Sequence, residues 1–526
     1  MLHTENRQCG KKSFHSITTT FIFVFLCMLS GCNGNRSIFD DSPQPLLHHF
    51  SESNLAACLS ECAQADRDTI AGDAMLRKLY AKGSHCHWVN EYGVSPSADT
   101  LISIISEAKD YGLSPNAFLI DSLRNSINRI NNRLFSANED TLRTLAEIEY
   151  TLSKSYLRYV TGTRFGFFNP NRVLNNLDFD RDPKNWSKKR YKRLFDIKTS
   201  KADSLFCTEA LSKISSADNL RGYLRALQPQ SKLYSQLKTM LADTTLSEAD
   251  RIKVLCNMER CRWQDTYPAD SSTKYVAVNI PAFHLYAYDN DSILDMRIGC
   301  GTFKNKTPLL KGNINRIDVN PVWIIPKSII EKEVSYHAGD TAYFSRNNYS
   351  IIEKETGDTI LPETLDANML KSGNYRIVQK SGPGNSLGRI AFRFPNNQSI
   401  YLHDTSSPAF FKREKRAVSH GCVRIQKPFD FACYLLSSPD EWLLDKIRIS
   451  IDIKPETERG KKFMKDNEEA DENTFRLVRS IDVNPNIPVY LLYFTIFPNQ
   501  DGAITKYNDV YGYDKIMWQY IKPIHQ

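Results

Sequence analysis

One stretch in the second half of the chain combines residue types that can carry out nucleophilic chemistry. A β-prone run ends at His403, and a basic loop then leads to the run Ser419-His420-Gly421-Cys422. A thiol beside an imidazole can lose its proton and attack a carbonyl carbon, and nearby cationic side chains favour the thiolate. These residue types therefore predict acyl transfer through Cys422, with His403 as its base.

Two neighbours of Cys422 have properties that acyl transfer needs. Gly421 lets the backbone approach a substrate and frees amide groups for a developing oxyanion. Arg424 lies two residues beyond Cys422, so in an extended chain both side chains face one side, where the guanidinium can hold a substrate carboxylate. The alternative is a buried apolar Cys422 and a hydrogen-bonded core histidine at His403. The flanking residues and the odd number of cysteines favour the catalytic interpretation.

The sequence offers His420 as a second candidate base. It lies two residues before Cys422, so one short stretch of backbone fixes their relative position and leaves little freedom to align a lone pair with the thiol. His403 comes from a separate strand, and its other ring nitrogen can donate to a carbonyl group that sets the tautomer. We therefore assign His403 as the base and expect His420 to shape the loop that presents the amides of Gly421 and Cys422.

The N-terminal residues have the pattern of an export signal. Basic residues precede the apolar run 21–29, which is followed by Ser30, Gly31 and Cys32. The run is shorter than the about 20 apolar residues of a spanning helix. Small residues directly before a cysteine resemble a bacterial lipobox, which implies a signal peptide at 1–31 and a lipid on Cys32; an ordinary signal peptide with a chance cysteine is the alternative. We expect a periplasm-facing envelope lipoprotein, tethered to the membrane through Cys32.

Length and charge limit the classes of partner. The chain has 526 residues, enough for several domains, and a net charge of +8. Its densest basic stretch is 184–201. Because the export signal separates the protein from cytoplasmic nucleic acid, we expect no nucleic-acid partner. A solvated basic face near anionic envelope polymers or lipid headgroups fits this stretch better.

Cysteine is frequent in this chain. Of twelve cysteines, Cys9 and Cys27 belong to the leader and Cys32 carries the expected lipid, so nine remain. The odd number predicts at least one reactive thiol, and the other eight can form disulfides in an oxidising compartment. One group rich in cysteine and histidine could alternatively bind zinc. Its spacing is irregular for a zinc site, so we expect no metal and no cofactor. That group consists of Cys58, Cys62, His85, Cys86 and His87.

The first part of the mature chain has helical periodicity. Residues 32–52 are polar and contain two prolines, as in a linker. Within 53–265, apolar residues recur at the spacing of a buried helical stripe, as at Leu101, Ile105 and Ala108. This pattern predicts a helical domain that carries no obvious chemistry.

The second part has short β-prone runs separated by turns. Residues 274–453 therefore predict a sandwich-like, all-β domain. It is interrupted at about 327–372 by a polar insertion, and insertions of this length in a β domain are usually functional. Residues 454–473 read as a charged linker, and 474–526 as a further β-containing extension. The fold class expected for the whole chain is α+β.

Several segments of the sequence resemble those of a known family, the YkuD-type L,D-transpeptidases, in the branch with a large scaffold domain. His403 followed by Ser-His-Gly-Cys-Val-Arg around Cys422 is similar to the family's motif. Further similar segments lie in the helical part, the β part and the extension: 110–115, 278–283, 320–326, 382–389, 489–493 and 509–512.

The resemblance implies peptidoglycan cross-linking. Cys422 would attack the carbonyl after the third residue of a tetrapeptide stem, release D-alanine and pass the acyl group to a diaminopimelate amine, giving a 3→3 cross-link. A backbone carbonyl would orient His403, and the amides of Gly421 and Cys422 would form the oxyanion hole. The insertion 327–372 would cap the substrate, and carbapenems would act as inhibitors. The resemblance also implies a substrate pocket that includes Trp323, Ser419, His420 and Arg424.

Two other functions stay open at this point. The first is an envelope cysteine peptidase or amidase, which would transfer the same acyl group to water. The second is a non-catalytic, wall-binding lipoprotein, against which the intact His403 and Cys422 argue. The branch often carries a compact peptidoglycan-binding module, and residues 201–251 contain no full-length version of it.

Overall fold

The computed structural model describes residues 46, 51–70, 72–81, 85–134, 138–182, 185–263, 266–268 and 272–526. The expected signal peptide 1–31, the lipid-bearing Cys32 and most of the expected linker lie outside these residues. Among the helices of the described part, none is long and apolar enough to cross a membrane.

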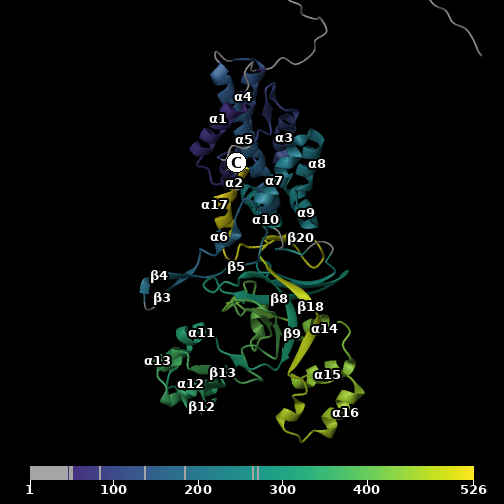
Figure 1. Ribbon diagram of the computed structural model, residues 1–526. Helices are drawn as coiled ribbons and strands as arrows, with labels where there is room; N and C mark the ends of the chain where they lie inside the picture. The colour runs from purple at the N-terminus through teal and green to yellow at the C-terminus, as the bar shows by residue number, and fades with distance from the viewer. Residues whose placement is uncertain are drawn as a thin grey trace, which may run out of the picture. The chain divides into compact units, whose positions relative to one another are not determined.

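The described chain begins with a helical domain built around the long helix α5 (Figure 1). Its buried residues Leu152, Tyr156 and Val160 follow each other at four-residue intervals, so they form one apolar stripe on which the neighbouring helices pack. The helices are α1 (Glu52–Ala65), α2 (Asp73–Tyr80), α3 (Pro96–Ser106), α4 (Ile120–Asn131), α5 (Asn138–Phe165), α6 (Pro170–Leu174), α7 (Ser204–Ser212), α8 (Ala217–Ala226), α9 (Lys232–Leu241) and α10 (Glu248–Arg262).

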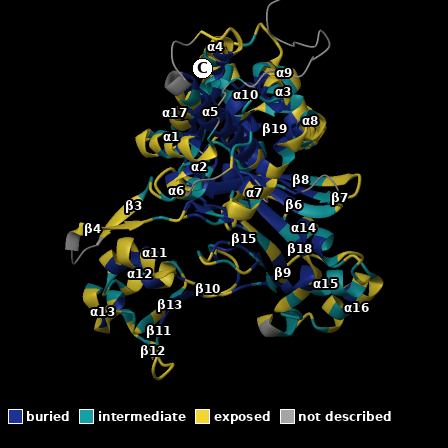
Figure 2. Cartoon of the chain, turned by 45° about the horizontal axis from the view of Figure 1, so that its top comes forward, coloured by how far each residue is buried: buried dark blue, intermediate teal, exposed yellow. Residues whose placement is uncertain are grey.

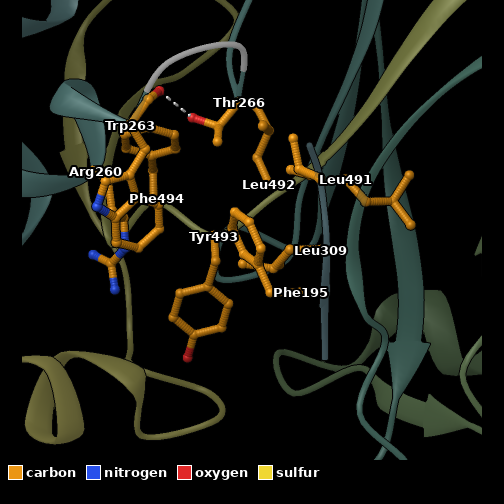
Figure 3. A pocket seen from close by; sticks show the side chains of 10 residues that line it. Phe195, Arg260, Trp263, Thr266, Leu309, Leu491, Leu492, Tyr493 and Phe494 are labelled. Carbon is orange, nitrogen blue, oxygen red and sulfur yellow. Dashed lines mark hydrogen bonds between the residues drawn. The ribbon is translucent and has the colours of Figure 1, made fainter. Parts of the chain in front are cut away.

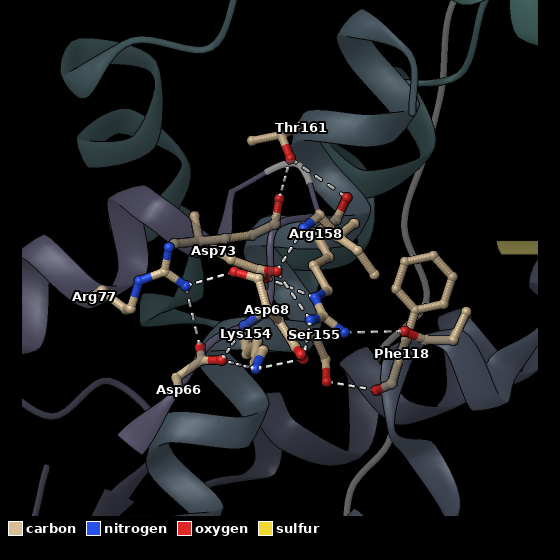
Figure 4. A network of polar contacts seen from close by, with 12 residues as sticks. Asp66, Asp68, Asp73, Arg77, Phe118, Lys154, Ser155, Arg158 and Thr161 are labelled. Atoms are coloured by element: carbon tan, nitrogen blue, oxygen red, sulfur yellow. Dashed lines mark hydrogen bonds and ion pairs between the residues drawn. The ribbon is translucent and has the colours of Figure 1, made fainter. Parts of the chain in front are cut away.

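A network of charges, most of them buried, fixes the segment between α1 and α2 against α5 (Figure 4). Arg158 donates through Nε to Asp73, at 2.7 Å, and through a terminal nitrogen to Asp68, also at 2.7 Å. Lys154 lies 2.7 Å from Asp66 and 2.9 Å from Asp68. Arg158 and Lys154 thus pair with three carboxylates, and Arg77 lies 3.8 Å from Asp66 as a third cation. Removing Arg158 would leave the fully buried carboxylate of Asp73 without its cationic partner.

A β-hairpin interrupts the region that the sequence predicts as helical. Strands β3 (Phe179–Asp182) and β4 (Asn185–Tyr191) pair antiparallel, and Figure 2 shows them largely exposed. The rings of Phe179 and Tyr191 contact each other across the hairpin, with their centroids 5.7 Å apart. Two further short strands, β1 (Val89–Asn90) and β2 (Gly93–Val94), pair near the start of the domain.

A ten-stranded sheet, built mostly from the second half of the chain, closes on itself. Its strands run in the order β14-β15-β17-β8-β7-β6-β18-β9-β5, with β16 beside β8, and β14 also pairs with β9. Closure removes most free edges and encloses an apolar core. The strands are β5 (Phe195–Asp196), β6 (Lys274–Asn279), β7 (His284–Asp289), β8 (Ser292–Gly301), β9 (Leu309–Val319), β14 (Ile390–Arg393), β15 (Leu402–His403), β16 (Ala417–Ser419), β17 (Val423–Ile425) and β18 (Ser480–Leu492).

The expected α+β class is confirmed, and the C-terminal extension turns out to complete the sheet. Strand β18 lies between β6, to which it is parallel, and β9, to which it is antiparallel. The chain then forms the hairpin of β19 (Ile496–Pro498) and β20 (Ile504–Lys506) and ends in α17 (Tyr513–His525). The Ser114 amide of the helical domain donates to the Ile524 carbonyl at 2.8 Å.

The helical domain and the sheet share a tightly packed junction (Figure 3). Phe195 of β5, Trp263 at the end of α10, Leu309 of β9 and Tyr493 line a cavity of about 20 Å³, which is roughly the space of one water molecule. Arg260 of α10 pairs with a carboxylate of α17. Helix α10 is buried over most of its second half, as Figure 2 shows, because it packs against both parts.

The insertion 327–372 and the strands that flank it, β10 and β13, form a folded subdomain with a core of its own. Its sheet has the order β10-β13-β11-β12, and the buried residues Ile329, Phe344, Ile351 and Ile377 pack together beneath it. Its elements are β10 (Trp323–Ile324), α11 (Lys327–Lys332), α12 (Thr341–Arg346), β11 (Tyr349–Glu353), β12 (Thr359–Ile360), α13 (Ala367–Ser372) and β13 (Tyr375–Gln379). We call it the cap subdomain.

Residues 454–473 are more ordered than the charged linker that the sequence predicts. They follow α14 (Pro428–Leu436) and α15 (Glu441–Ser450) and contain α16 (Glu458–Asp466). The buried carboxylate of Asp445 accepts hydrogen bonds from the amides of Glu456 and Thr457 and from the Thr457 hydroxyl. Thr457 in turn caps α16, so a single buried carboxylate orders this charged segment.

Candidate active site

Two short parallel strands bring His403 and Cys422 together. In the pairing of β15 with β17, Leu402 is opposite Val423 and His403 is opposite Arg424. Leu402 and Val423 are fully buried in the core. Because side chains alternate along a strand, the residues before and after them point to the other face of the sheet, where His403, Cys422 and Arg424 gather.

The ring of His403 is held in one orientation. Its Nδ1 lies 2.6 Å from the main-chain oxygen of Asp404, so Nδ1–H donates and the lone pair is left on Nε2. The side chain is 4 % exposed. Burial, followed by the charge of Arg424, lowers the pKa of His403 to about 3, against the opposing effect of carbonyl contacts with Asp404 and Leu387. The imidazole is therefore neutral and oriented at neutral pH, with the Nε2 lone pair free to accept a proton.

The thiol of Cys422 is protonated in the resting site. Burial raises its pKa to about 11, although a backbone hydrogen bond from Tyr401 and the charges of Arg393 and Arg424 act in the other direction. Its Sγ lies 3.7 Å from the main-chain oxygen of Ser399. The sequence suggested that nearby cations favour the thiolate; here burial outweighs them. The arrangement fits proton transfer to His403 during attack rather than a preformed ion pair.

This electrostatic state predicts an unusual pH profile. Because the folded pKa of His403 is about 3 rather than its ordinary 6.5, the base stays neutral above that value and is lost only when the pH falls through it. We expect the acylation rate of Cys422 to show no inflection near pH 6.5. The measurement is the rate of covalent adduct formation from about pH 4 to pH 8, with circular dichroism as a check of folding. An inflection near 6.5 would contradict this assignment.

The loop before the thiol is held by its own hydrogen bonds. Gly421 has φ of +131°, which favours glycine. Its carbonyl accepts from the Thr307 hydroxyl at 2.7 Å, and its amide donates to the Ser419 hydroxyl at 3.1 Å. That hydroxyl donates to the Cys422 carbonyl at 2.5 Å. The Gly421 amide is thus used within the loop, and the two-amide oxyanion hole that the resemblance implies is not preformed.

His420 points to the cap subdomain. Its Nε2 lies 2.6 Å from a carboxylate oxygen of Glu333, which follows α11, and both side chains are about half exposed (48 % and 50 %). The second ring that the sequence offered as a base is therefore held by another partner. This contact joins the loop that precedes Cys422 to the cap subdomain.

Arg424 carries a charge that has no acidic partner within the described residues. Its Nε is buried and makes no hydrogen bond there, and its guanidinium lies 5.8 Å from the ring of Phe410. Burial lowers its pKa, while the proximity of Cys422 acts in the opposite sense. A substrate carboxylate would compensate this charge beside the thiol.

Tyr401 is a neighbour of the thiol that the sequence pattern did not single out. Burial and the proximity of Cys422 raise its pKa to about 12, and hydrogen bonds with Arg393 and Trp323 act against this. The guanidinium of Arg393 lies 4.0 Å from its ring, and the Tyr401 and His403 rings are 5.7 Å apart. Tyr401 precedes His403 by two residues, so strand alternation could have placed it on the catalytic face. Trp323 joins this group from the first strand of the cap subdomain.

The other cysteines and histidines do not assemble a second reactive group in the described part. No disulfide joins the described cysteines, and no group of three or more potential ligands could hold a metal ion there. Cys207, Cys256 and Cys300 instead pack as small apolar residues, in two separate cores.

Known proteins resemble both parts of the chain. Residues 273–438 match the L,D-transpeptidase catalytic domain, YkuD, and residues 74–241 match the Scaffold domain. A protein of Haemophilus influenzae named "Putative L,D-transpeptidase" is 28 % identical over 317 residues. The matched region covers 58 % of this chain and 58 % of that protein, which is less than two thirds of its length.

Proposed function

Because the chain belongs to the YkuD-type L,D-transpeptidases with a scaffold domain, we propose that it forms 3→3 cross-links in peptidoglycan. Its donor would be a tetrapeptide stem and its acceptor the side-chain amine of a neighbouring diaminopimelate. The observation that carries the proposal is the pairing of β15 with β17, which places the oriented imidazole of His403 and the thiol of Cys422 on the same face of two neighbouring strands.

The proposed reaction has two acyl-transfer steps. Cys422 Sγ attacks the carbonyl after the third stem residue while its proton passes to Nε2 of His403. The bond to D-alanine then breaks, and the leaving amine takes that proton. In the second step the acceptor amine attacks the thioester and loses a proton to His403, and the carbon–sulfur bond breaks to return the thiol. Arg424 is suited to hold a stem carboxylate, and Trp323 contributes to the pocket from the cap subdomain.

Product analysis tests this proposal. The purified chain is incubated with a disaccharide tetrapeptide, with and without a second diaminopimelate-containing stem, and the products are separated and weighed by mass spectrometry. A cross-linked dimer and free D-alanine are expected. A tripeptide without cross-linked dimer would identify a peptidase or amidase. An unmodified substrate would favour the interpretation as a non-catalytic, wall-binding lipoprotein.

The envelope location is part of the same proposal. Lipid on Cys32 would anchor the protein to a membrane, since one acyl chain binds only marginally and several bind stably. We expect the Cys32→Ser variant to shift from the membrane fraction to the soluble fraction of lysed cells, measured by immunoblot. A variant that still sediments entirely with membranes would contradict lipidation at Cys32.

A further inference from the structure

A large basic cleft lies between the helical domain and the sheet. It has a volume of about 800 Å³ and lies between residues 193–201 and strand β9. Four cationic side chains and one carboxylate line it, together with smaller polar groups. The charged residues are Arg193, Asp196, Lys198, Lys201 and Lys311.

The positive charge of this cleft is largely uncompensated. Arg193 pairs with Asp196 at 2.9 Å, so the only carboxylate of the lining is already engaged. Lys198, Lys201 and Lys311 are exposed, and none has an acidic partner among the described residues. Three like charges around one concavity raise the local concentration of anions.

The walls of the cleft are fixed before any ligand binds. One wall is β9, which pairs with β18, and its Gly312 packs so closely that a Cβ there would lie 2.7 Å from the ring of Phe394. The other wall is fixed by β5 and by Thr199, whose hydroxyl accepts from Asn171 at 3.2 Å. The lysines therefore extend from an ordered frame.

One loop connects the cleft with the catalytic thiol. Gln398 donates to Asp196 in the cleft wall at 3.4 Å, and the next residue, Ser399, has its carbonyl oxygen 3.7 Å from Cys422 Sγ. Asn396 holds this loop by accepting from the amides of Gln398 and Ile400, at 3.0 Å each. The thiol and the cleft wall therefore contact neighbouring residues of one short loop.

We propose that the cleft binds the carboxylates of a second, non-reacting stem peptide on the polymer whose other stem occupies the active site. This rests on the proposed function, since it takes the substrate to be peptidoglycan. Stem peptides carry several carboxylates and repeat along the glycan. Lysines on flexible stems act as point charges without the bidentate geometry of arginine, so they suit carboxylates distributed over a flexible polymer. Binding of this second stem would position the polymer so that the reacting stem lies at the Cys422 thiol.

Binding to isolated cell walls tests this site without catalysis. The full chain carrying Cys422→Ala is mixed with purified sacculi, and the bound fraction is measured at rising salt. Adding Lys198→Gln, Lys201→Gln and Lys311→Gln should weaken binding about tenfold and flatten its salt dependence. The matched control is Lys454→Gln, Lys462→Gln and Lys465→Gln, which removes the same charge from exposed positions in and near α16 and should have little effect.

Two further probes identify the ligand. Sacculi with chemically amidated carboxylates should bind the unsubstituted and the cleft-substituted proteins equally weakly. Vesicles containing phosphatidylglycerol test the other anionic surface of the envelope. Equal losses in both triple variants, or loss of vesicle binding with unchanged sacculus binding, would overturn the proposal. If the triple variant fails to fold, Lys198→Gln with Lys201→Gln carries the same test. Because no turnover is involved, an absence of cross-linked products would refute the proposed reaction separately.

Discussion

Replacing Cys422 with alanine is expected to abolish both cross-link formation and reaction with a carbapenem, with activity reduced by more than about 10⁴-fold. The carbapenem should acylate the unsubstituted protein, since its strained cyclic amide presents the same kind of carbonyl to the thiol. The variant removes one sulfur atom from a partly accessible loop position, so the fold should persist. Intact-mass spectrometry measures the adduct, and thermal unfolding measures the fold.

The other cysteines supply the matched control. Cys433 of α14 is also partly accessible, and Cys433→Ala should keep both the adduct and the products. Burial raises the pKa of Cys433 as it raises that of Cys422, so the control thiol has its pKa shifted in the same direction and for the same reason. A carbapenem adduct on the Cys422→Ala protein, or cross-linked products from it, would refute the nucleophile.

The parts of the site that could be predicted from the sequence depend on local rules. Strand alternation is a local property, and it places His403 and Arg424 on the catalytic face once the strands are recognised. A carbonyl partner for the base ring was also expected, and the structure places the Asp404 carbonyl there. The helical and β periodicities likewise separated the two halves of the chain.

The parts that could not be predicted depend on contacts between distant segments. Closure of the sheet requires β14 to find β9, and the ordering of α16 requires one buried carboxylate, Asp445, that no local pattern distinguishes. The Gly421 amide and the Ser419 hydroxyl belong to residues only two positions apart, yet their hydrogen bond depends on a turn that the distant Thr307 holds. The raised pKa of Cys422 could not be predicted from the sequence either, because burial is a property of the assembled fold.

His403→Ala is expected to reduce the acylation rate by about 10²–10⁴-fold, whereas His420→Ala should cost less than about tenfold. His403 has its Nδ1 fixed by the Asp404 carbonyl and presents the Nε2 lone pair on the face that carries the thiol. His420 has its Nε2 on Glu333, so that nitrogen is engaged with the cap subdomain. The rates are measured as adduct formation on Cys422 under saturating carbapenem, with folded protein verified by thermal unfolding.

Glu333→Gln separates the two roles. This substitution weakens the contact between His420 and the cap subdomain and leaves both histidines in the sequence. It should therefore reproduce the small effect of His420→Ala. Combining it with His420→Ala should add little, because both changes act on the same contact and coupled residues are non-additive. His403→Ala should lose its rate regardless of Glu333, since its partner is a main-chain carbonyl that no substitution in the cap subdomain alters. A larger loss in His420→Ala than in His403→Ala would reverse the assignment of the base.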